Sequence, residues 1–241
     1  MTDPDVREAI MEATYEALCE HGYTDLTAQD IADRTDKSKS LLFYHYDSKD
    51  DLVADLLAYL REQFDEGIET TRTLAPTTRL AMFIDWYLYG SSGEDERRSF
   101  HTALLELRTQ APHNERYREQ LQRSDEQLRT TLEEILQDGI DAGEFVDHDT
   151  AETAALLLAA LDGARTRQLA FNRDEYLGQV RSGVITQVID DLLADDASFP
   201  AETQQELFGS GPEDAQADGE PSADANGDAD DDSKTSGGDD S

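Results

Sequence analysis

Apolar residues recur every three or four positions through most of this chain, and that spacing limits its fold more than any other feature. The first stripe consists of Val6, Ala9, Ile10, Ala13, Ala17 and Leu18. Such spacing places apolar side chains on one face of an α-helix. No segment keeps the two-residue alternation of a half-buried strand. The sequence therefore predicts an all-α protein of about nine helices.

Capping residues and glycines predict where these helices begin and end. Gly22 is placed to end the first helix, and Tyr23 and Leu26 are predicted to anchor the turn that follows. Thr27 opens the second helix, and Asp30 three residues later forms an acidic variant of the capping box. The predicted N-caps of the third and fourth helices are Ser38 and Ser48. The later predicted helices cover residues 39–46, 49–73, 77–90, 96–109, 113–141, 149–172 and 175–194.

The charge of the chain bears on the partners it can bind. With 55 acidic and 20 basic residues its formal net charge is −35, which at first argues against nucleic acid as a partner. The acids are dispersed and lysine is scarce, a combination typical of proteins from salt-accumulating halophiles, where molar salt screens surface charge. Lys37, Lys39 and Lys49 nevertheless lie within thirteen positions of one another. That clustering favours phosphate contact over an ordinary surface.

The composition changes near Ala197. From Asp196 to Ser241 the chain has 14 acids and one lysine, and it lacks aromatic residues after Phe208. Such a segment cannot bury enough apolar surface to fold, so we expect it to be disordered. Its simplest role is solubility, and competition with DNA for a basic surface is the alternative. The sequence therefore divides into an N-terminal region (1–48), a helical region (49–196) and an acidic tail (197–241).

Several classes of protein are disfavoured. No apolar run is long enough for a membrane span, no secretory signal begins the chain, and Cys19 is the only cysteine. These features favour a cytoplasmic protein without disulfides. The five histidines show no metal-ligand spacing, and neither a phosphate loop nor a nucleophile elbow is present. We therefore expect no enzyme activity, no metal and no cofactor.

Residues 26–52 carry the most specific pattern. A helix-turn-helix is expected where a Thr-led helix is followed by a turn and a short helix that is polar at its start. The segments concerned are Leu26–Ala32, Ser38–Tyr46 and Ser48–Leu52. Together they resemble the N-terminal domain of the tetracycline-repressor (TetR) family, and the resemblance covers about residues 5–55. The all-helical remainder is similar to that family's ligand-binding and dimerisation domain. The resemblance therefore implies a helix-turn-helix DNA-binding domain over residues 1–48 and a ligand-binding and dimerisation domain over residues 49–196.

The resemblance implies a DNA-binding surface. Its predicted residues are Thr27, Gln29, Lys37, Ser38, Lys39, Ser40, Leu41, Tyr44, His45 and Lys49. Helix N-termini and lysines contact phosphates, and the first residues of the third helix reach base edges in the major groove. A tyrosine is frequent in the family where this chain has Phe43, so Tyr44 or His45 would supply that contact. Packing of Tyr44 against the fourth helix is the alternative, and Leu42 and Leu52 are predicted to be core.

The resemblance also implies a homodimer on a palindromic site of double-stranded DNA and a small-molecule effector of unknown identity. The predicted dimer-interface residues are Leu157, Leu158, Leu161, Val180, Val184 and Val188, with packing inside a monomer as the alternative. The predicted pocket residues are Phe83, Trp86, Tyr87, Tyr89, Phe100, His101 and Leu105, with plain core as the alternative. The predicted function is a transcriptional regulator, a repressor released by its ligand. A helical small-molecule or protein-binding module without DNA binding is the alternative.

Overall fold

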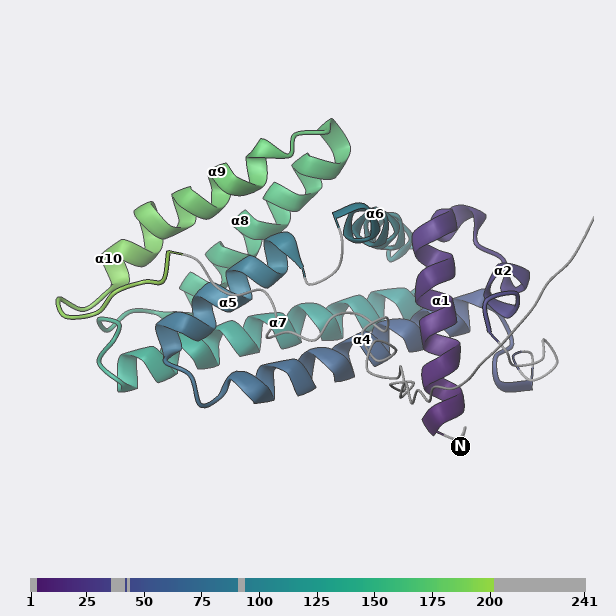
Figure 1. The fold of residues 1–241 in the computed structure, drawn as a ribbon, viewed down its shortest axis with the longest axis horizontal. Helices are drawn as coiled ribbons and strands as arrows, with labels where there is room; N and C mark the ends of the chain where they lie inside the picture. The colour runs from purple at the N-terminus through teal and green to yellow at the C-terminus, as the bar shows by residue number, and fades with distance from the viewer. Residues whose placement is uncertain (1–3, 36–41, 43, 91–93, 202–241) are drawn as a thin grey trace, which may run out of the picture.

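The computed structural model describes residues 4–35, 42, 44–90 and 94–201. Within these residues all regular structure is helical, and the isolated bridge between Phe145 and Leu193 is the only strand-like pairing (Figure 1). The all-α prediction is confirmed. The helices are α1 (Pro4–Asp25), α2 (Ala28–Ala32), α4 (Lys49–Thr71), α5 (Pro76–Tyr89), α6 (Glu94–Gln110), α7 (Glu115–Asp141), α8 (Thr150–Phe171), α9 (Glu175–Val184) and α10 (Asp190–Leu192).

The observed helix boundaries follow from capping. Thr27 Oγ1 accepts a hydrogen bond from the Asp30 backbone N–H at 3.3 Å, and the Asp30 carboxylate accepts one from the Thr27 backbone N–H at 2.8 Å. The predicted capping box is therefore confirmed. Ser48, the predicted cap of the fourth helix, accepts a hydrogen bond from the Asp51 backbone N–H at 3.2 Å. Gly22, the predicted end of the first helix, has a positive φ of 68° and marks a kink, but a last helical turn follows it and ends at Asp25.

Two predicted helices are only partly matched by the structure. Half of the predicted third helix, residues 39–41 and 43, lies outside the described residues, and Leu42 of this segment is fully buried. The predicted helix over 175–194 is not one regular α-helix. It widens into a π-helical stretch, Ile185–Ile189, before the short α10. The predicted disorder of the acidic tail concerns residues that, from 202 onward, also lie outside the described part of the chain.

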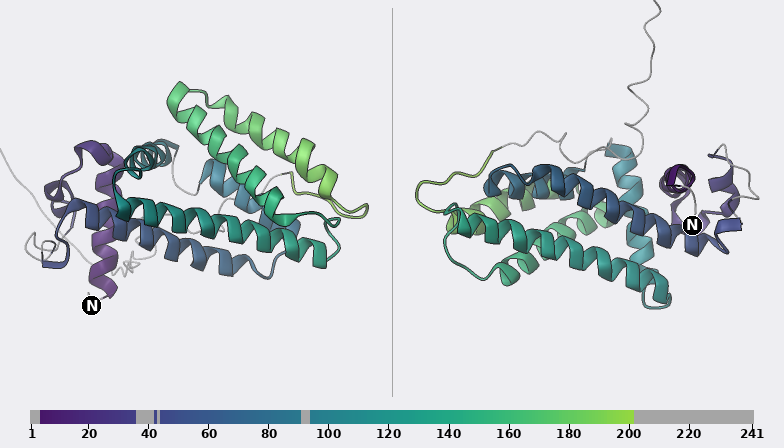
Figure 2. Two further views of the ribbon diagram at one scale, coloured as in Figure 1. Left: turned by 180° about the vertical axis from the view of Figure 1, so that it is seen from behind. Right: turned by 90° about the horizontal axis from the view of Figure 1, so that it is seen from below.

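The helices are arranged along one long axis. In Figure 1, α1 and α2 lie at one end, and α4 and α7 run side by side through the body. Helices α8 and α9 pack against each other, and Figure 2 shows this pairing from two other directions. Both helices contact α5, and α8 also contacts α7. Helix α6 crosses beside α1 and makes extensive contact with it.

Two clusters of buried apolar residues hold this arrangement together. One joins α1 and α2 to the first half of α4, and it also takes in Ala103 and Leu107 of α6 and Tyr117 of α7. The other fills the space between α5, α7, α8 and α9. Leu42 and Leu52, both predicted to be core, are buried in the first cluster, so that prediction is confirmed. The first cluster contains residues from both sides of the predicted domain border at residues 48 and 49. It includes residues of α6, which packs against α1, so α6 helps to support α1.

Candidate functional site

Lys49 connects the start of α4 to the turn that leads into α2. Its ammonium donates hydrogen bonds to the backbone carbonyls of Tyr23 at 2.9 Å and Leu26 at 3.0 Å, and it lies 4.6 Å from the centre of the Tyr23 ring. These carbonyls follow the kink at Gly22 and have lost their regular helical partners. Lys49 therefore stabilises the turn, in addition to the phosphate contact predicted for it.

Other predicted DNA-binding residues lie near this turn. Thr27 is exposed at the start of α2, and hydrogen bonds from its hydroxyl and backbone N–H lower the pKa of Asp30. Gln29 is exposed two residues further on, where its amide donates to the Asp33 carboxylate at 2.5 Å. Thr27 and Gln29 therefore lie on the outer surface of α2.

Tyr44 is the most exposed large apolar side chain of this region. It is 81% exposed, and its ring meets that of His45 edge-on at 5.1 Å. The tyrosine that packs on α4 is instead Tyr46, which is buried and donates a hydrogen bond to the Asp55 carboxylate at 2.5 Å. Tyr44 is therefore accessible to a partner. The remaining predicted DNA-binding residues, Lys37, Ser38, Lys39, Ser40 and Leu41, lie outside the described residues.

Asp50 holds the start of α4 against two other helices. Its carboxylate accepts hydrogen bonds from the hydroxyls of Tyr23 at 3.1 Å and Tyr117 at 2.8 Å, and from the side-chain amide of Asn114 at 3.1 Å. Burial, with the neighbouring Tyr23, raises the pKa of Tyr117. Sequence reasoning missed this cluster, because an acid in the first turn of a helix is ordinary and its partners lie far away in the sequence.

Glu106 makes a corresponding connection from α6. Its carboxylate accepts hydrogen bonds from the backbone N–H groups of Tyr23 at 2.9 Å and Thr24 at 3.2 Å. Both groups follow the kink at Gly22, whose Cα faces the same carboxylate. The turn before α2 is therefore held from α4 and from α6 together.

A cavity of about 1100 Å³ lies between these helices, with walls from α1, α4, α5, α6, α7 and α8. The predicted pocket residues in its wall are Trp86, Tyr87, Phe100, His101 and Leu105. Phe83 and Tyr89 are not in the wall, since Phe83 is fully buried and Tyr89 packs against the core between α5 and α9. Sequence reasoning missed the contribution of α1, whose Tyr15 ring lies 5.1 Å from that of Phe100.

Arg165 places a buried positive charge at one end of the cavity. It is only 4% exposed, and its guanidinium donates to the side chain of Gln168 at 2.7 Å and to the backbone carbonyls of Tyr87 at 3.2 Å and Leu88. Its Nε has no hydrogen-bond partner in the part of the chain that the structure describes. Burial, then Arg97, lowers the pKa of Arg165 to about 10, so the group stays charged at neutral pH.

Two further charged groups line the same end. Arg108 pairs with Asp162 at 2.5 Å, and the Tyr87 hydroxyl donates to the same carboxylate at 3.0 Å. Burial, then Arg165 and Arg108, lowers the pKa of His101 to about 3, which keeps this imidazole neutral. A sequence signal for Arg165 did exist. It stands four residues after Leu161 in the stripe that α8 turns toward the core.

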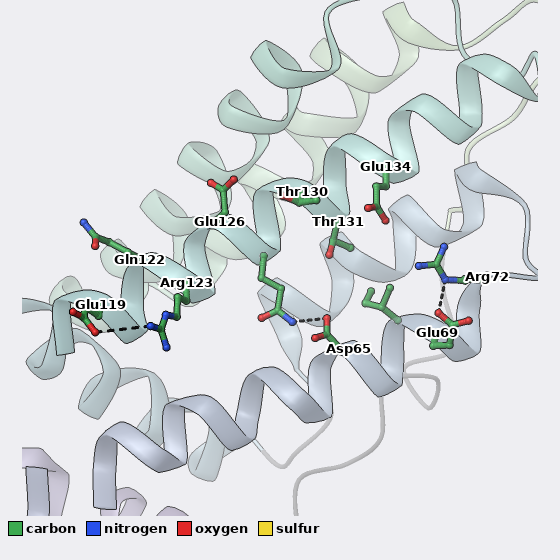
Figure 3. Close-up of a pocket in the computed structure, with 12 residues that line it drawn as sticks. Asp65, Glu69, Arg72, Glu119, Gln122, Arg123, Glu126, Thr130, Thr131 and Glu134 are labelled. Carbon is green, nitrogen blue, oxygen red and sulfur yellow. Dashed lines mark hydrogen bonds and ion pairs between the residues drawn. The ribbon is translucent and has the colours of Figure 1, made fainter. Parts of the chain in front are cut away.

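A second hollow, of about 690 Å³, lies between α4 and α7 on the surface (Figure 3). Its wall is formed mainly by exposed charged and amide side chains. Examples are the ion pair of Glu119 with Arg123 at 3.9 Å and the hydrogen bond from Gln127 to Asp65 at 2.5 Å. Aromatic side chains are missing from this wall. Since ligand pockets are mostly apolar with a few polar groups, this hollow is a poor candidate for an organic ligand.

The residues predicted to form a dimer interface lie on α8, α9 and the π-helical stretch, but many of them face inward. Leu157, Leu161 and Val184 are buried in the core of the chain itself, and Leu158 lines the cavity. Val180 and Val188 are partly buried against the same core. The apolar stripe that marked these residues is therefore the inner face of the helix pair. On α8, Leu156 is 56% exposed and Phe171 64% exposed.

Within the described residues, no group of His, Cys, Asp and Glu side chains is arranged to hold a metal ion. No described helix has both the length and the apolar character needed to cross a bilayer.

Two family models match the chain. The one described as "Bacterial regulatory proteins, tetR family" matches residues 10–56, and the one described as "BetI-type transcriptional repressor, C-terminal" matches residues 76–195. No curated protein matches.

Solved structures extend the comparison. A TetR transcription regulator from Haloarcula marismortui is 40% identical, with a TM-score of 0.70, over 79% of this chain and 100% of that chain. A transcriptional regulator from Saccharomonospora viridis in complex with choline is 22% identical, with a TM-score of 0.64, over 76% of this chain and 97% of that chain. FadR from Bacillus subtilis, in complex with stearoyl-CoA, is 19% identical, with a TM-score of 0.60, over 75% of this chain and 98% of that chain. At these lower identities the last two support the fold alone.

Proposed function

Because the chain belongs to the TetR family of ligand-responsive, DNA-binding transcriptional regulators, we propose that it acts as a homodimeric repressor. In this proposal two copies bind a palindromic operator through the helix-turn-helix. A small molecule in the cavity between α4 and α8 then releases the operator. Two neighbours of this fold were crystallised in complex with small molecules, choline and stearoyl-CoA, which supports a small-molecule ligand.

The observation that carries this proposal is the extent of the cavity wall. It runs from Arg165 on α8 to Tyr15 on α1, the first helix of the DNA-binding domain. A bound molecule therefore contacts the DNA-binding domain directly and does not depend on a distant relay. Helix α4 adds a second route, since Leu57 and Phe64 line the cavity and Lys49 and Asp50 hold the turn before α2.

A ligand that changes the position of α1 or α4 changes the spacing of the two recognition helices in the dimer. DNA half-sites have a fixed separation of one helical turn, so a change in spacing lowers DNA affinity. Thermodynamic reciprocity requires that operator DNA lower the affinity for the ligand by the same factor. Measuring ligand affinity with and without DNA therefore checks the proposal from both sides.

The test of DNA binding uses the region upstream of the chain's own coding sequence, in about 2 M KCl to screen the acidic surface. Lys39→Ala is the test variant, and Lys234→Ala in the tail is the matched control, because it removes the same charge. We expect sequence-specific binding that Lys39→Ala weakens and Lys234→Ala leaves unchanged. Failure to bind any specific site at any salt concentration would favour the alternative, a ligand-binding module without DNA binding.

The dimer is proposed to form through the outer face of α8 and α9. Leu156 and Phe171 are exposed there, and a Cβ added at Gly163 or Gly178 would meet no atom of the same chain within 4 Å. Two such faces can pack as a four-helix interface. Light scattering in high salt should give a dimer mass for the unaltered chain and a monomer mass for Leu156→Arg. Val146→Arg is the control, since Val146 is a similarly exposed apolar residue between α7 and α8.

A further inference from the structure

We infer that the effector is an organic anion whose acidic group binds beside Arg165, with its apolar part along the aromatic wall of the cavity. This inference rests on the proposed function, because it names the chemical class of the molecule that fills the same cavity. The site lies where the end of α5, the middle of α6 and α8 meet.

The buried charge of Arg165 is the main reason. A charged group removed from water is costly unless a countercharge and hydrogen bonds compensate it. Among the described residues, Arg165 donates only to neutral oxygens, those of Gln168, Tyr87 and Leu88, and its Nε has no partner. The two carbonyls lie in the last turn of α5, where the helix dipole offers about half a negative charge. A positive charge thus stays partly uncompensated inside the protein.

The surroundings add positive rather than negative charge. Arg97 lines the same end of the cavity, and it acts with burial to lower the pKa of Arg165. Asp162 is the carboxylate at this end, and Arg108 already pairs with it. The neutral imidazole of His101 can donate a hydrogen bond to an incoming acid.

These charges disfavour a cationic effector at this end. A quaternary ammonium is bound by aromatic faces and nearby carboxylates, and here it would meet Arg165 and Arg97, while the carboxylate of Asp162 is already paired with Arg108. The other acids of the wall are Glu8 and Glu12 on α1 and Asp125 and Glu126 on α7. Glu8, Asp125 and Glu126 are exposed, Glu12 is half-buried, and Glu126 already pairs with Arg129. A cation beside the exposed acids would gain little, because water already solvates their carboxylates.

The rest of the wall indicates the shape of the ligand. Trp86, Phe64 and Phe100 line the cavity, and the rings of Trp86 and Phe64 lie 4.9 Å apart. A volume of about 1100 Å³ exceeds what a small carboxylate alone fills. The site therefore suits a molecule with one acidic group and a long or ring-containing apolar part.

The experiment uses three probes with the same eight-carbon chain and different head groups: octanoate, octyltrimethylammonium and octan-1-ol. Trp86 is the only tryptophan of the chain and lies in the cavity wall, so its fluorescence reports occupancy directly. Titrations of the full chain in about 2 M KCl give the affinities under conditions where surface charge is screened. We expect octanoate to bind at least tenfold more tightly than octyltrimethylammonium. Equal or reversed affinities, or no response to octanoate, would overturn the inference.

A variant assigns the effect to one residue. Arg165→Met should weaken octanoate binding by about tenfold to a hundredfold, the loss of one charged hydrogen-bond partner, and should change octan-1-ol binding by less than about threefold. Arg72→Met is the matched control, since Arg72 lies on the surface and outside this cavity. Equal weakening of both probes by Arg165→Met would also overturn the inference. If this variant fails to fold, the comparison of the three probes on the unaltered chain decides alone.

Failure of the inference and failure of the proposed function give different results. If octyltrimethylammonium releases the operator and octanoate does not, the inference is wrong while ligand-induced release stands. If octanoate binds most tightly and operator affinity is unchanged, the class of ligand is supported and the release mechanism is wrong.

Discussion

Glu106→Ala tests whether α6 supports the DNA-binding domain. The change removes the acceptor of two backbone N–H groups, those of Tyr23 at 2.9 Å and Thr24 at 3.2 Å. A hydrogen bond to a charged group contributes about 1.5–3 kcal/mol when it is shielded. Thr24 is exposed, so water replaces part of the second bond. We therefore expect the free energy of unfolding to fall by about 1–2 kcal/mol.

The measurement is urea unfolding in high salt at one fixed protein concentration, because a dimer's stability depends on concentration. Glu106→Gln, which keeps one acceptor oxygen, should lose about half as much. Glu69→Ala is the control, an exposed acid paired only with its neighbour Arg72, and should stay within about 0.5 kcal/mol of the unaltered chain. Operator affinity should fall with Glu106→Ala and not with Glu69→Ala. An unchanged unfolding free energy in Glu106→Ala would refute the role of α6.

Three further changes test other parts of the molecule. Gly139→Ala should lower the free energy of unfolding by about 1–3 kcal/mol in urea, because the added Cβ would lie 2.1 Å from the ring of buried Phe145. Combined with Phe145→Leu, it should lower that free energy by less than the sum of the two single changes. Burial, then Arg165, lowers the pKa of His101 to about 3, so between about pH 7.5 and pH 5.5 only the unfolded chain gains this proton. The unfolding free energy of the unaltered chain should therefore fall about 1 kcal/mol more over that range than that of His101→Gln, and equal slopes would contradict this. Tyr44→Ala should weaken operator binding about three- to tenfold in a titration without changing stability, since the side chain is exposed; full affinity would exclude Tyr44 from the interface.

The helical architecture could be predicted from the sequence because local rules determine it. Thr27 and Ser48 are caps whose partners lie three residues away, and apolar spacing defines each helix without knowledge of its neighbours. The π-helical stretch Ile185–Ile189 could not be predicted in this way. Its residues continue the apolar spacing of α9, and nothing in that spacing distinguishes a widened turn from a regular one.

The sites were predicted less completely, because their residues meet through the tertiary fold. The aromatic cluster of α5 and α6 pointed to the cavity, yet Phe83 of the same cluster faces the core. Apolar spacing cannot decide which side of a buried helix meets a cavity and which meets another helix. The same limit applies to Leu157 and Leu161, since an inner face and a dimer face have the same composition.

Tyr23 shows how the cavity and the DNA-binding surface are joined. Its backbone N–H donates to Glu106 of α6, its carbonyl accepts from Lys49 of α4, and its hydroxyl donates to Asp50 of α4. Helices α4 and α6 also form walls of the cavity, so a ligand that changes their spacing acts on every one of these bonds. Tyr23 lies four residues before the cap of α2, so in the proposed mechanism a displacement of α4 relative to α6 would strain these bonds. Either α2 would then tilt or the bonds would break. Both responses would move the helix-turn-helix, which gives the proposed ligand a route from the cavity to the DNA-binding surface.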